Sequence, residues 1–177
     1  MSLHVIIDGY NFIRQSDDLR ELDRQALEFG RDALIEKLVA YKRIKRHKVT
    51  LVFDGSQKYF FPENSSSWKG VGIKFSRHGE TADSLIRKMA EREKEKAVVV
   101  SSDREVIRFA AARGAGIIES GDFEDKLLMA EMTASGAAVE DEGAGSPNRR
   151  GKTTKKKGPA RKPPKSRRRI LKKTGKL

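Results

Sequence analysis

Four aspartates at the ends of apolar segments are the residues of this chain best suited to catalysis. They are Asp8, Asp54, Asp83 and Asp103, with Glu80 as a fifth carboxylate close to Asp83. Carboxylates that lie close together repel one another unless a cation neutralises them, and ligands that are all oxygen atoms suit Mg²⁺ or Mn²⁺. Magnesium held by carboxylates activates water and stabilises the charge of a phosphodiester under in-line attack. The acids therefore predict metal-dependent phosphodiester hydrolysis, provided that the fold brings them together.

Alternating strands and helices predict how these acids meet. The segments with the composition of buried strands, two of them weaker, are Val5–Ile7, Val49–Phe53, Ala97–Val100, Val71–Ser76 and Gly116–Glu119. Helices are expected over about Arg24–Lys45, Ala82–Lys96, Asp103–Arg113 and Phe123–Met132. The alternation predicts an α/β fold with a doubly wound, mainly parallel sheet flanked by helices. Because ligands bind outside the carboxyl ends of such strands, Asp8, Asp54 and Asp103 should share one edge.

Each acid also has a purely structural interpretation. Asp83 and Asp103 could complement the dipoles of the helices that they begin, at about 0.3–1 kcal/mol each. Ser102 and Glu105 have the spacing of a capping box. Asp54 could belong to a turn after its strand. The spacing of the whole set across the domain, rather than any single residue, favours a site.

Charge divides the chain into two parts. The formal net charge is +13, but residues 146–177 hold 15 Lys or Arg and no Asp or Glu, which leaves 23 basic and 25 acidic residues before them. Such a segment buries too little apolar area to offset its backbone entropy, so we expect disorder. The expected organisation is a folded domain over 1–136, a linker over 137–145 and a basic tail over 146–177.

Other protein classes are disfavoured by composition. The chain has no cysteine, which excludes disulfides, thiolate metal sites and thiol nucleophiles. No apolar run approaches the roughly 20 residues of a membrane span, and the first one is too short for a signal peptide. A cytoplasmic protein without a membrane partner is the simplest expectation.

Four segments, in order along the chain, resemble the motifs of the YacP-like NYN domain family, bacterial relatives of PIN-domain nucleases. They are Val5–Asn11, Leu51–Gly55, Gly79–Asp83 and Val99–Asp103. The resemblance covers about residues 3–135 and not the tail. It implies a PIN-like fold and metal-dependent endoribonuclease activity, in some members on messenger RNA at the ribosome. By analogy with PIN nucleases, the products would carry a 5′-phosphate and a 3′-hydroxyl.

The resemblance also implies roles for individual residues. Asp8, Asp54, Asp83 and Asp103 would form the acidic site, with Glu80 as an additional metal ligand. Because Asp8 and Asp103 follow buried strands, we expect these two to bind the ion directly and the other two aspartates to complete the shell directly or through water. Asn11 would orient a ligand or a water. The predicted catalytic set is thus the four aspartates and Asn11.

Candidate RNA contacts lie near the acids and in the tail. They are Lys58, Lys69, Arg77, Arg149, Arg150, Lys155, Lys156, Lys157, Arg167, Arg168 and Arg169. The connection Ser56–Gly70 should overhang the site, and its aromatic residues could stack on bases, although they could equally pack the loop onto the domain. His78 could act in acid–base chemistry or be an ordinary loop histidine. The tail should bind messenger or ribosomal RNA, or DNA, through counterion release, or it could be a solubilising extension.

The leading hypothesis is a Mg²⁺- or Mn²⁺-dependent endoribonuclease that acts on RNA, with the ribosome as a candidate partner. The alternative is a non-catalytic RNA- or ribosome-binding protein whose acidic cluster is vestigial. A phosphatase of small substrates is disfavoured, because no second aspartate follows Asp8 at position 10, which is Tyr10.

Overall fold

The computed structural model describes residues 3–55 and 65–134, and its strands follow the apolar runs of the sequence. The strands in these ranges are β1 (His4–Asp8), β2 (Lys48–Phe53), β3 (Ser65–Trp68), β4 (Val71–Phe75), β5 (Ala97–Val100) and β6 (Gly116–Ile118). They form one sheet in the order β3-β4-β2-β1-β5-β6. Every pairing is parallel except that of β3 with β4. The predicted α/β class with a mainly parallel sheet is confirmed.

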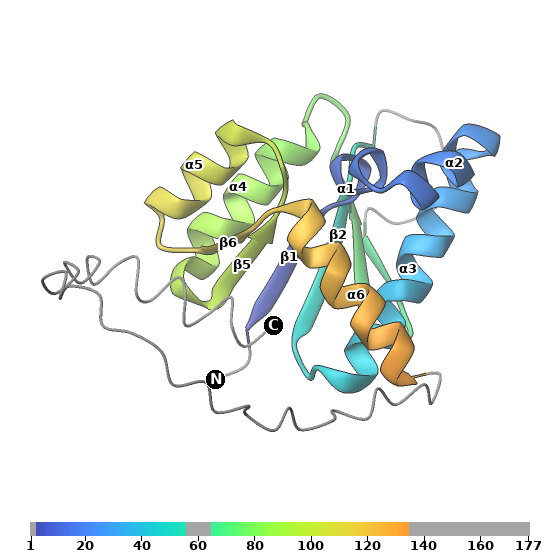
Figure 1. Cartoon of the computed structure of the whole chain (residues 1–177). Helices are drawn as coiled ribbons and strands as arrows, with labels where there is room; N and C mark the ends of the chain where they lie inside the picture. Colours follow the sequence, from blue (N-terminus) through green and yellow to red (C-terminus); the bar gives the residue numbers. More distant parts are fainter. Residues whose placement is uncertain (1–2, 56–64, 135–177) are drawn as a thin grey trace, which may run out of the picture.

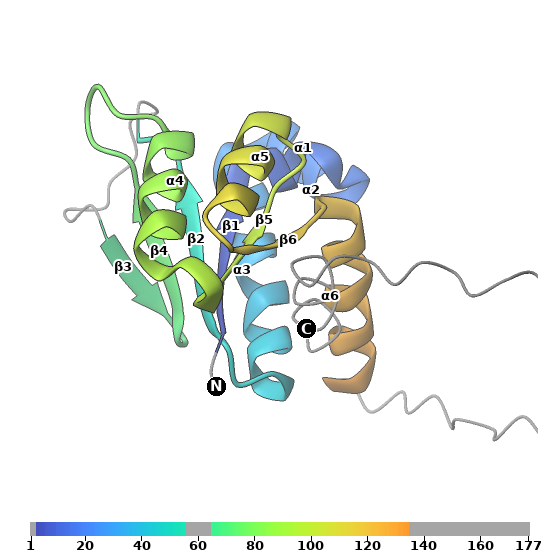
Figure 2. The same cartoon turned by 90° about the vertical axis from the view of Figure 1, so that its left-hand side faces the viewer.

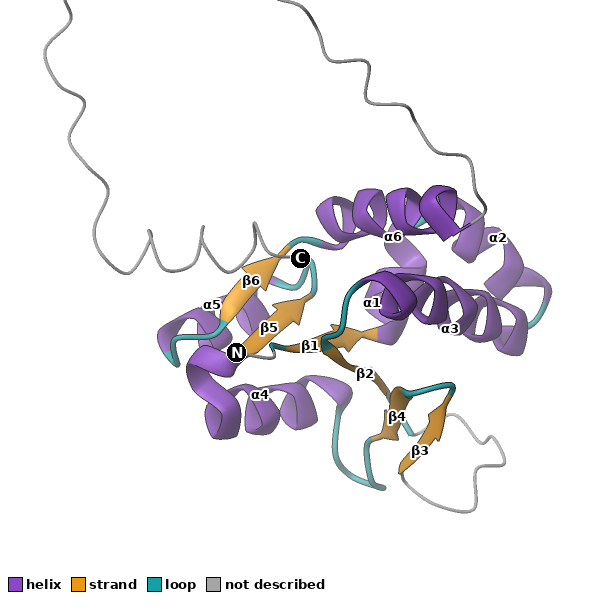
Figure 3. Ribbon diagram, turned by 90° about the horizontal axis from the view of Figure 1, so that it is seen from below, coloured by secondary structure: helices purple, strands orange, loops and turns teal. Residues whose placement is uncertain are grey.

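Helices cover both faces of the sheet. They are α1 (Gly9–Gln15), α2 (Asp17–Gln25), α3 (Leu27–Ile44), α4 (Ala82–Glu93), α5 (Arg104–Ala112) and α6 (Ser120–Ala134), with a 3₁₀ turn at Lys94–Lys96. Viewed along the strands in Figure 3, α4 and α5 lie on one side, while α1, α2, α3 and α6 lie on the other. Figure 1 shows the same three layers from the front, with the sheet between α4–α5 and α3–α6.

Alternation along β1 supplies both layers with core residues. Val5 and Ile7 belong to the larger core beneath α3 and α6, whereas Ile6 belongs to the smaller core beneath α4 and α5. All three are completely buried, as a central strand of a doubly covered sheet requires. Because β1 pairs with β2 on one side and β5 on the other, the two cores share this strand.

The first helical region differs from its prediction. Sequence periodicity predicts one helix over Arg24–Lys45, but Ala26 is extended and separates α2 from α3. Ser16 both ends α1 and caps α2, since its hydroxyl accepts a hydrogen bond from the Leu19 backbone N–H at 3.4 Å. Helix α1 has only seven residues, and the strongly charged α2 buries only Leu19, so neither contains enough apolar residues to be recognised from the sequence.

The segment before β4 is also different. We expected Ser56–Gly70 to be a connection that overhangs the acids, whereas Ser65–Trp68 is a strand that turns into β4 through Lys69 and Gly70. Both turn residues have positive φ, 45° and 84°. Figure 2 shows this turn at the lower end of the sheet, opposite the upper end where β4 leads into α4. The expectation for this part of the segment was therefore wrong; residues 56–64, including Lys58, lie outside the described residues.

The predicted linker and basic tail lie outside the described residues as well, because the description ends at Ala134. Among the helices of residues 3–55 and 65–134, none has the length and apolar composition needed to cross a membrane.

Candidate active site

The four aspartates follow the carboxyl ends of the parallel strands. Asp8 is the last residue of β1, and its register partner on β2 is Val52, so Asp54 comes just beyond the same level. Asp103 follows β5 and caps α5, while Asp83 lies in the first turn of α4. These strands are adjacent in the order β2-β1-β5. The edge at the top of Figure 1, beside the starts of α1, α4 and α5, is therefore the predicted location of the acids.

Asp8 is the most buried of these acids, with only 7% of its surface exposed. It caps α1, and its Oδ1 accepts a hydrogen bond from the Asn11 backbone N–H at 3.2 Å. Burial, followed by the negative charges of Asp83 and Asp103, raises the pKa of Asp8 to about 6, although hydrogen bonds from Asn11 and Ser101 act against the rise. The charged form of Asp8 is thus disfavoured in the folded protein, and a nearby cation would stabilise it.

Asp83 is affected by the other members of the set. Burial and then the charge of Asp103 raise the pKa of Asp83, and Glu105 and Asp54 contribute in the same direction. Arg87 lowers this pKa, and its guanidinium also pairs with Glu105 at 3.1 Å. These mutual effects indicate that the four aspartates share one electrostatic environment, with Arg87 and Glu105 at its border.

Ser101 connects two of the acids, and sequence reasoning did not single it out. It is completely buried, its Oγ accepts a hydrogen bond from the Asp103 backbone N–H at 3.1 Å, and its side chain also bonds Asp8. Asp103 in turn caps α5 through Oδ1, which accepts from the backbone N–H groups of Glu105 at 2.7 Å and Val106 at 3.2 Å. Because residues 8 and 101 meet only through strand pairing, no local pattern identifies this serine.

Asn11 stabilises the backbone around the acids. Its Oδ1 accepts hydrogen bonds from the Ser102 backbone N–H at 2.9 Å and from the Ser120 hydroxyl at 3.2 Å. The side-chain oxygen therefore joins α1 to the β5–α5 connection and to the start of α6. This contact supports a role in positioning Asp103 rather than the expected role in orienting a ligand through that oxygen.

The glycines of both Asp-Gly pairs are required by packing. A Cβ on Gly9 would overlap the Phe53 ring, and a Cβ on Gly55 would overlap the carbonyl oxygen of Ser76. The Phe53 ring also packs against Tyr10, with ring centroids 5.0 Å apart. Close contact between the residues that follow Asp8 and precede Asp54 holds the ends of β1 and β2 together.

The donor chemistry of the acidic set suits a hard divalent cation, because it offers only carboxylate oxygens. Within the described residues, however, no three His, Asp or Glu side chains stand together as a ready group for one ion. Mg²⁺ commonly binds through one or two carboxylates and keeps waters and substrate phosphates in its other positions. An ion held by Asp8 and Asp103 would fit that arrangement, with Asp54 and Asp83 reached directly or through water.

Glu80 belongs to different surroundings. Its carboxylate pairs with the Lys88 ammonium at 2.7 Å and accepts from the Arg77 backbone N–H at 3.5 Å. The Lys88 contact lowers the pKa of Glu80, the opposite of the direction found for Asp8 and Asp83. The structure therefore places Glu80 among cations, and not among the four acids with which the sequence grouped it.

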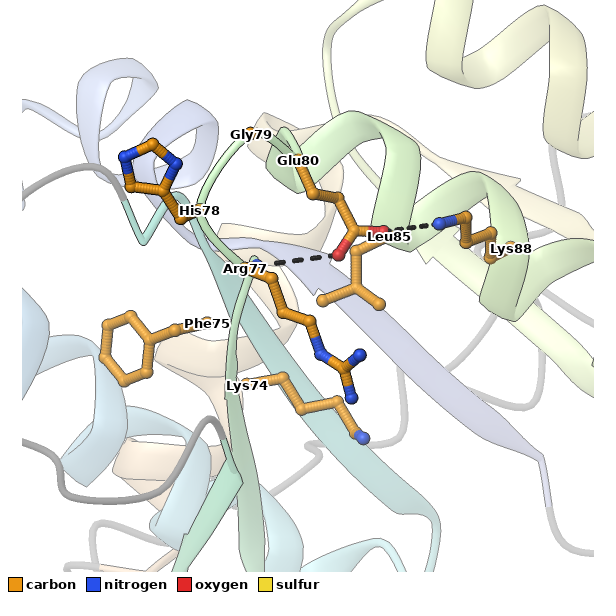
Figure 4. A pocket seen from close by; sticks show the side chains of 8 residues that line it. All are labelled: Lys74, Phe75, Arg77, His78, Gly79, Glu80, Leu85 and Lys88. Carbon is orange, nitrogen blue, oxygen red and sulfur yellow. Dashed lines mark hydrogen bonds and ion pairs between the residues drawn. The ribbon is translucent and has the colours of Figure 1, made fainter.

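A pocket of about 510 Å³ contains these cations beside the start of α4. It is lined by Lys74, Phe75, Arg77, His78, Gly79, Glu80, Leu85 and Lys88. In Figure 4, Lys74 and Arg77 project from the end of β4 and the loop after it, while Leu85 and Lys88 come from α4. We expected Arg77 and His78 to lie near the acids. In the structure both residues line this pocket beside the start of α4.

The remaining predicted RNA contact in the described residues, Lys69, lies away from the acids. Its Nζ pairs with Glu36 of α3 at 3.1 Å, and Trp68 donates to the same carboxylate at 3.3 Å. Both side chains are exposed beside the β3–β4 turn. The other predicted contacts, Lys58 and the tail residues from Arg149 to Arg169, lie outside the described residues.

Comparison with known proteins gives consistent results. The sequence profile of the YacP-like NYN domain matches residues 5–166, which extends past the 3–135 of the motif resemblance. YacP of Bacillus subtilis (strain 168) is 31% identical over 87 residues, a match that spans 49% of this chain and only 51% of that relative.

Two solved structures of the Bacillus subtilis protein are also similar. The crystal structure of Rae1 (YacP) superposes with a TM-score of 0.64 at 26% identity, over 77% of this chain and 79% of that one. The crystal structure of a mutant of the same protein gives 0.62 at 25% identity, over 73% and 77%. The shared architecture covers most of the residues described above.

Proposed function

The chain belongs to the YacP-like NYN domain family, which is part of the PIN-like nuclease superfamily, and on that premise we propose that it is a metal-dependent endoribonuclease. The observation that carries the proposal is the electrostatic coupling of the acids. Asp8 and Asp83 both have raised pKa values because burial and neighbouring carboxylates disfavour their charged forms. Groups arranged at such a cost are typical of functional sites.

Each residue of the acidic set has a proposed task. Asp8 and Asp103 would hold a divalent cation, and Asp54 and Asp83 would complete the shell directly or through water. Bound Mg²⁺ or Mn²⁺ would supply charge neutralisation at the scissile phosphate and a lower pKa for the attacking water. Ser101 and Asn11 position the acids, because the first bonds both Asp8 and Asp103 and the second fixes the backbone at Ser102.

The substrate that this family relationship supports is RNA. We propose that the chain cleaves internal phosphodiester bonds of RNA, with ribosome-associated messenger RNA as the candidate target, and leaves a 5′-phosphate and a 3′-hydroxyl. The described surface has a basic pocket beside the acids, which is compatible with a polyanionic substrate.

The decisive experiment is cleavage of labelled single-stranded RNA, with and without ribosomes, in Mg²⁺, Mn²⁺ and EDTA. Wild type is compared with Asp8→Asn and Asp103→Asn. Cutting that needs both a divalent cation and the two aspartates would support the nuclease.

A non-catalytic RNA- or ribosome-binding protein is the second candidate. It is favoured by one observation: the basic pocket lined by Lys74, Arg77 and Lys88 could bind an RNA phosphate without any cleavage. Equal RNA binding by wild type and both variants, without cutting under any of these conditions, would favour that candidate over the nuclease.

A further inference from the structure

The basic pocket beside α4 has no role in the chemistry assigned to the four aspartates. Three cations line it, Lys74, Arg77 and Lys88, against one carboxylate, that of Glu80. Among the described residues, Lys74 and Arg77 form no ion pair, and Lys88 pairs with Glu80. A concave site with surplus positive charge is suited to an anion, and its apolar residues Phe75 and Leu85 suit a ligand that also carries an uncharged part.

The beginning of α4 contributes both to this pocket, through Leu85 and Lys88, and to the acidic set, through Asp83. Leu85 and Lys88 are three residues apart and share the helix face that lines the pocket. Asp83 precedes Leu85 by two residues, which is about 200° around the axis at 3.6 residues per turn. Asp83 and Arg87 are four residues apart, and Arg87 reaches across to Glu105 of α5. The first turns of α4 therefore direct Asp83 and Arg87 toward α5, and Leu85 and Lys88 toward the pocket.

We propose that the pocket binds a backbone phosphate of the RNA strand, on one side of the bond that the acidic site cleaves. This inference rests on the proposed nuclease function. Arg77 and Lys88 would contact the phosphate, Lys74 would add charge beneath it, and Phe75 with Leu85 would contact the adjoining sugar or base. Glu80 holds Lys88 in the absence of RNA and opposes the anion, so the phosphate competes with an internal carboxylate.

The positions of the pocket and the acids also determine the path of the bound RNA strand. An α-helix is about 10 Å across, and a stacked strand advances about 3.4 Å per nucleotide, so roughly three nucleotides would span α4 between pocket and acids. The strand would cross over the beginning of α4. RNA that ends before reaching the pocket should therefore be cut poorly even when it contains a cleavable bond.

Binding is tested on the full chain in EDTA, so that no cutting occurs, with an oligouridylate of about six nucleotides, a length within the usual site size. Amide NMR shifts should appear at Arg77–Glu80 and around Lys88. Affinity is then measured against salt concentration. Loss of one phosphate contact should reduce the slope of log affinity against log salt by about 0.7. The double variant Arg77→Glu/Lys88→Glu removes both cations from the single proposed phosphate and should therefore lose about 0.7, while any contribution from the tail is common to all variants.

The control is Lys96→Glu, which makes the same single charge reversal as Lys74→Glu, at an exposed residue just before β5 and at the other end of the sheet. It should keep the wild-type slope. Glu80→Gln should raise affinity, because it removes the opposing charge and releases Lys88. Circular dichroism checks that each variant is folded, and Lys74→Glu provides an independent second variant if the double variant is not.

Two results would overturn the proposal that the pocket binds a phosphate. One is a set of amide shifts that avoids residues 74–88; the other is a salt slope that the pocket variants and Lys96→Glu change equally. Failure of the nuclease proposal is recognised separately, because wild type would then not cut in Mg²⁺ or Mn²⁺. If wild type cuts while Asp8→Asn does not, and folded pocket variants bind and cut like wild type, then the nuclease stands and the pocket inference falls.

Discussion

Replacing Asp8 with asparagine should stabilise the metal-free protein while it removes the proposed activity. Asp8 is 7% exposed, and its pKa rises from 3.8 to about 6. An acid whose pKa is higher in the folded state binds its proton more tightly there. Folding is therefore most favourable while Asp8 is protonated, and stability falls as pH rises from about 4 through about 6.

The magnitude follows from the same values. At about 1.4 kcal/mol per pKa unit, a rise from 3.8 to about 6 corresponds to about 3 kcal/mol lost above pH 6. Asparagine keeps an oxygen that can accept from the Asn11 backbone N–H and avoids the buried charge. Asp8→Asn should therefore gain up to about 3 kcal/mol at pH 7.5, or about 10 °C in Tm for a domain of this size. Near pH 4 the gain should vanish.

Urea unfolding in EDTA between pH 4 and pH 8 measures this difference directly. The quantity of interest is the free energy of unfolding of Asp8→Asn minus that of wild type, since titrations shared by both proteins cancel. Ser102→Ala offers a nearby control in which Asp8 is unchanged. If Asp8→Asn is less stable than wild type at pH 7.5, and the difference does not depend on pH, then the charged carboxylate of Asp8 does not destabilise the folded protein and the reasoning is refuted.

Three further outcomes are expected. Ser101→Ala should cost about 1–3 kcal/mol, because the Asp103 backbone N–H loses its buried partner, and NMR titration should find the pKa of Asp8 raised further. Gly9→Ala should cost about 1–3 kcal/mol in urea unfolding through overlap with Phe53, whereas Gly121→Ala, which meets nothing within 4 Å, should cost no more than about 0.5 kcal/mol. Addition of Mg²⁺ at pH 7.5 should raise the Tm of wild type but not that of Asp8→Asn, since a ligand that binds only the folded state stabilises it; equal increases would argue against Asp8 as a metal ligand.

The features that could be predicted from the sequence are those that depend on residues close together along the chain. The apolar runs Val5–Ile7 and Ala97–Val100 predicted buried strands, and both are strands with fully buried interiors. The aspartates that follow these runs lie at the carboxyl edge because parallel pairing of β1, β2 and β5 requires it. Strand β3 was missed because Ser65–Ser67 has no apolar alternation and is held by its hairpin with β4.

Features that depend on long-range contacts could not be read in this way. Ser101 acquires its partner only because β1 and β5 are neighbours in the sheet, although 93 positions separate it from Asp8. Glu80 precedes Asp83 by three positions, yet a turn with positive φ at Gly79 and the capping of α4 by Thr81 leave it beside Lys88. Because Glu80 and Asp83 are close in sequence, we expected them in one acidic group. In the fold, Glu80 lies beside Lys88 and Asp83 lies with the other aspartates.

The bonds of Asn11 have a consequence for the order in which the chain folds. Its oxygen is joined to residues 91 and 109 positions later, and β1 completes its pairing only when β5 is present. Contacts of such long range form slowly because loop closure must come before them. During synthesis, Asp8 leaves the ribosome before Asp103 and the start of α6, so its surroundings are completed only later. A growing chain therefore has no assembled acidic site, and the proposed activity would begin only after Asp103 and the start of α6 have left the ribosome.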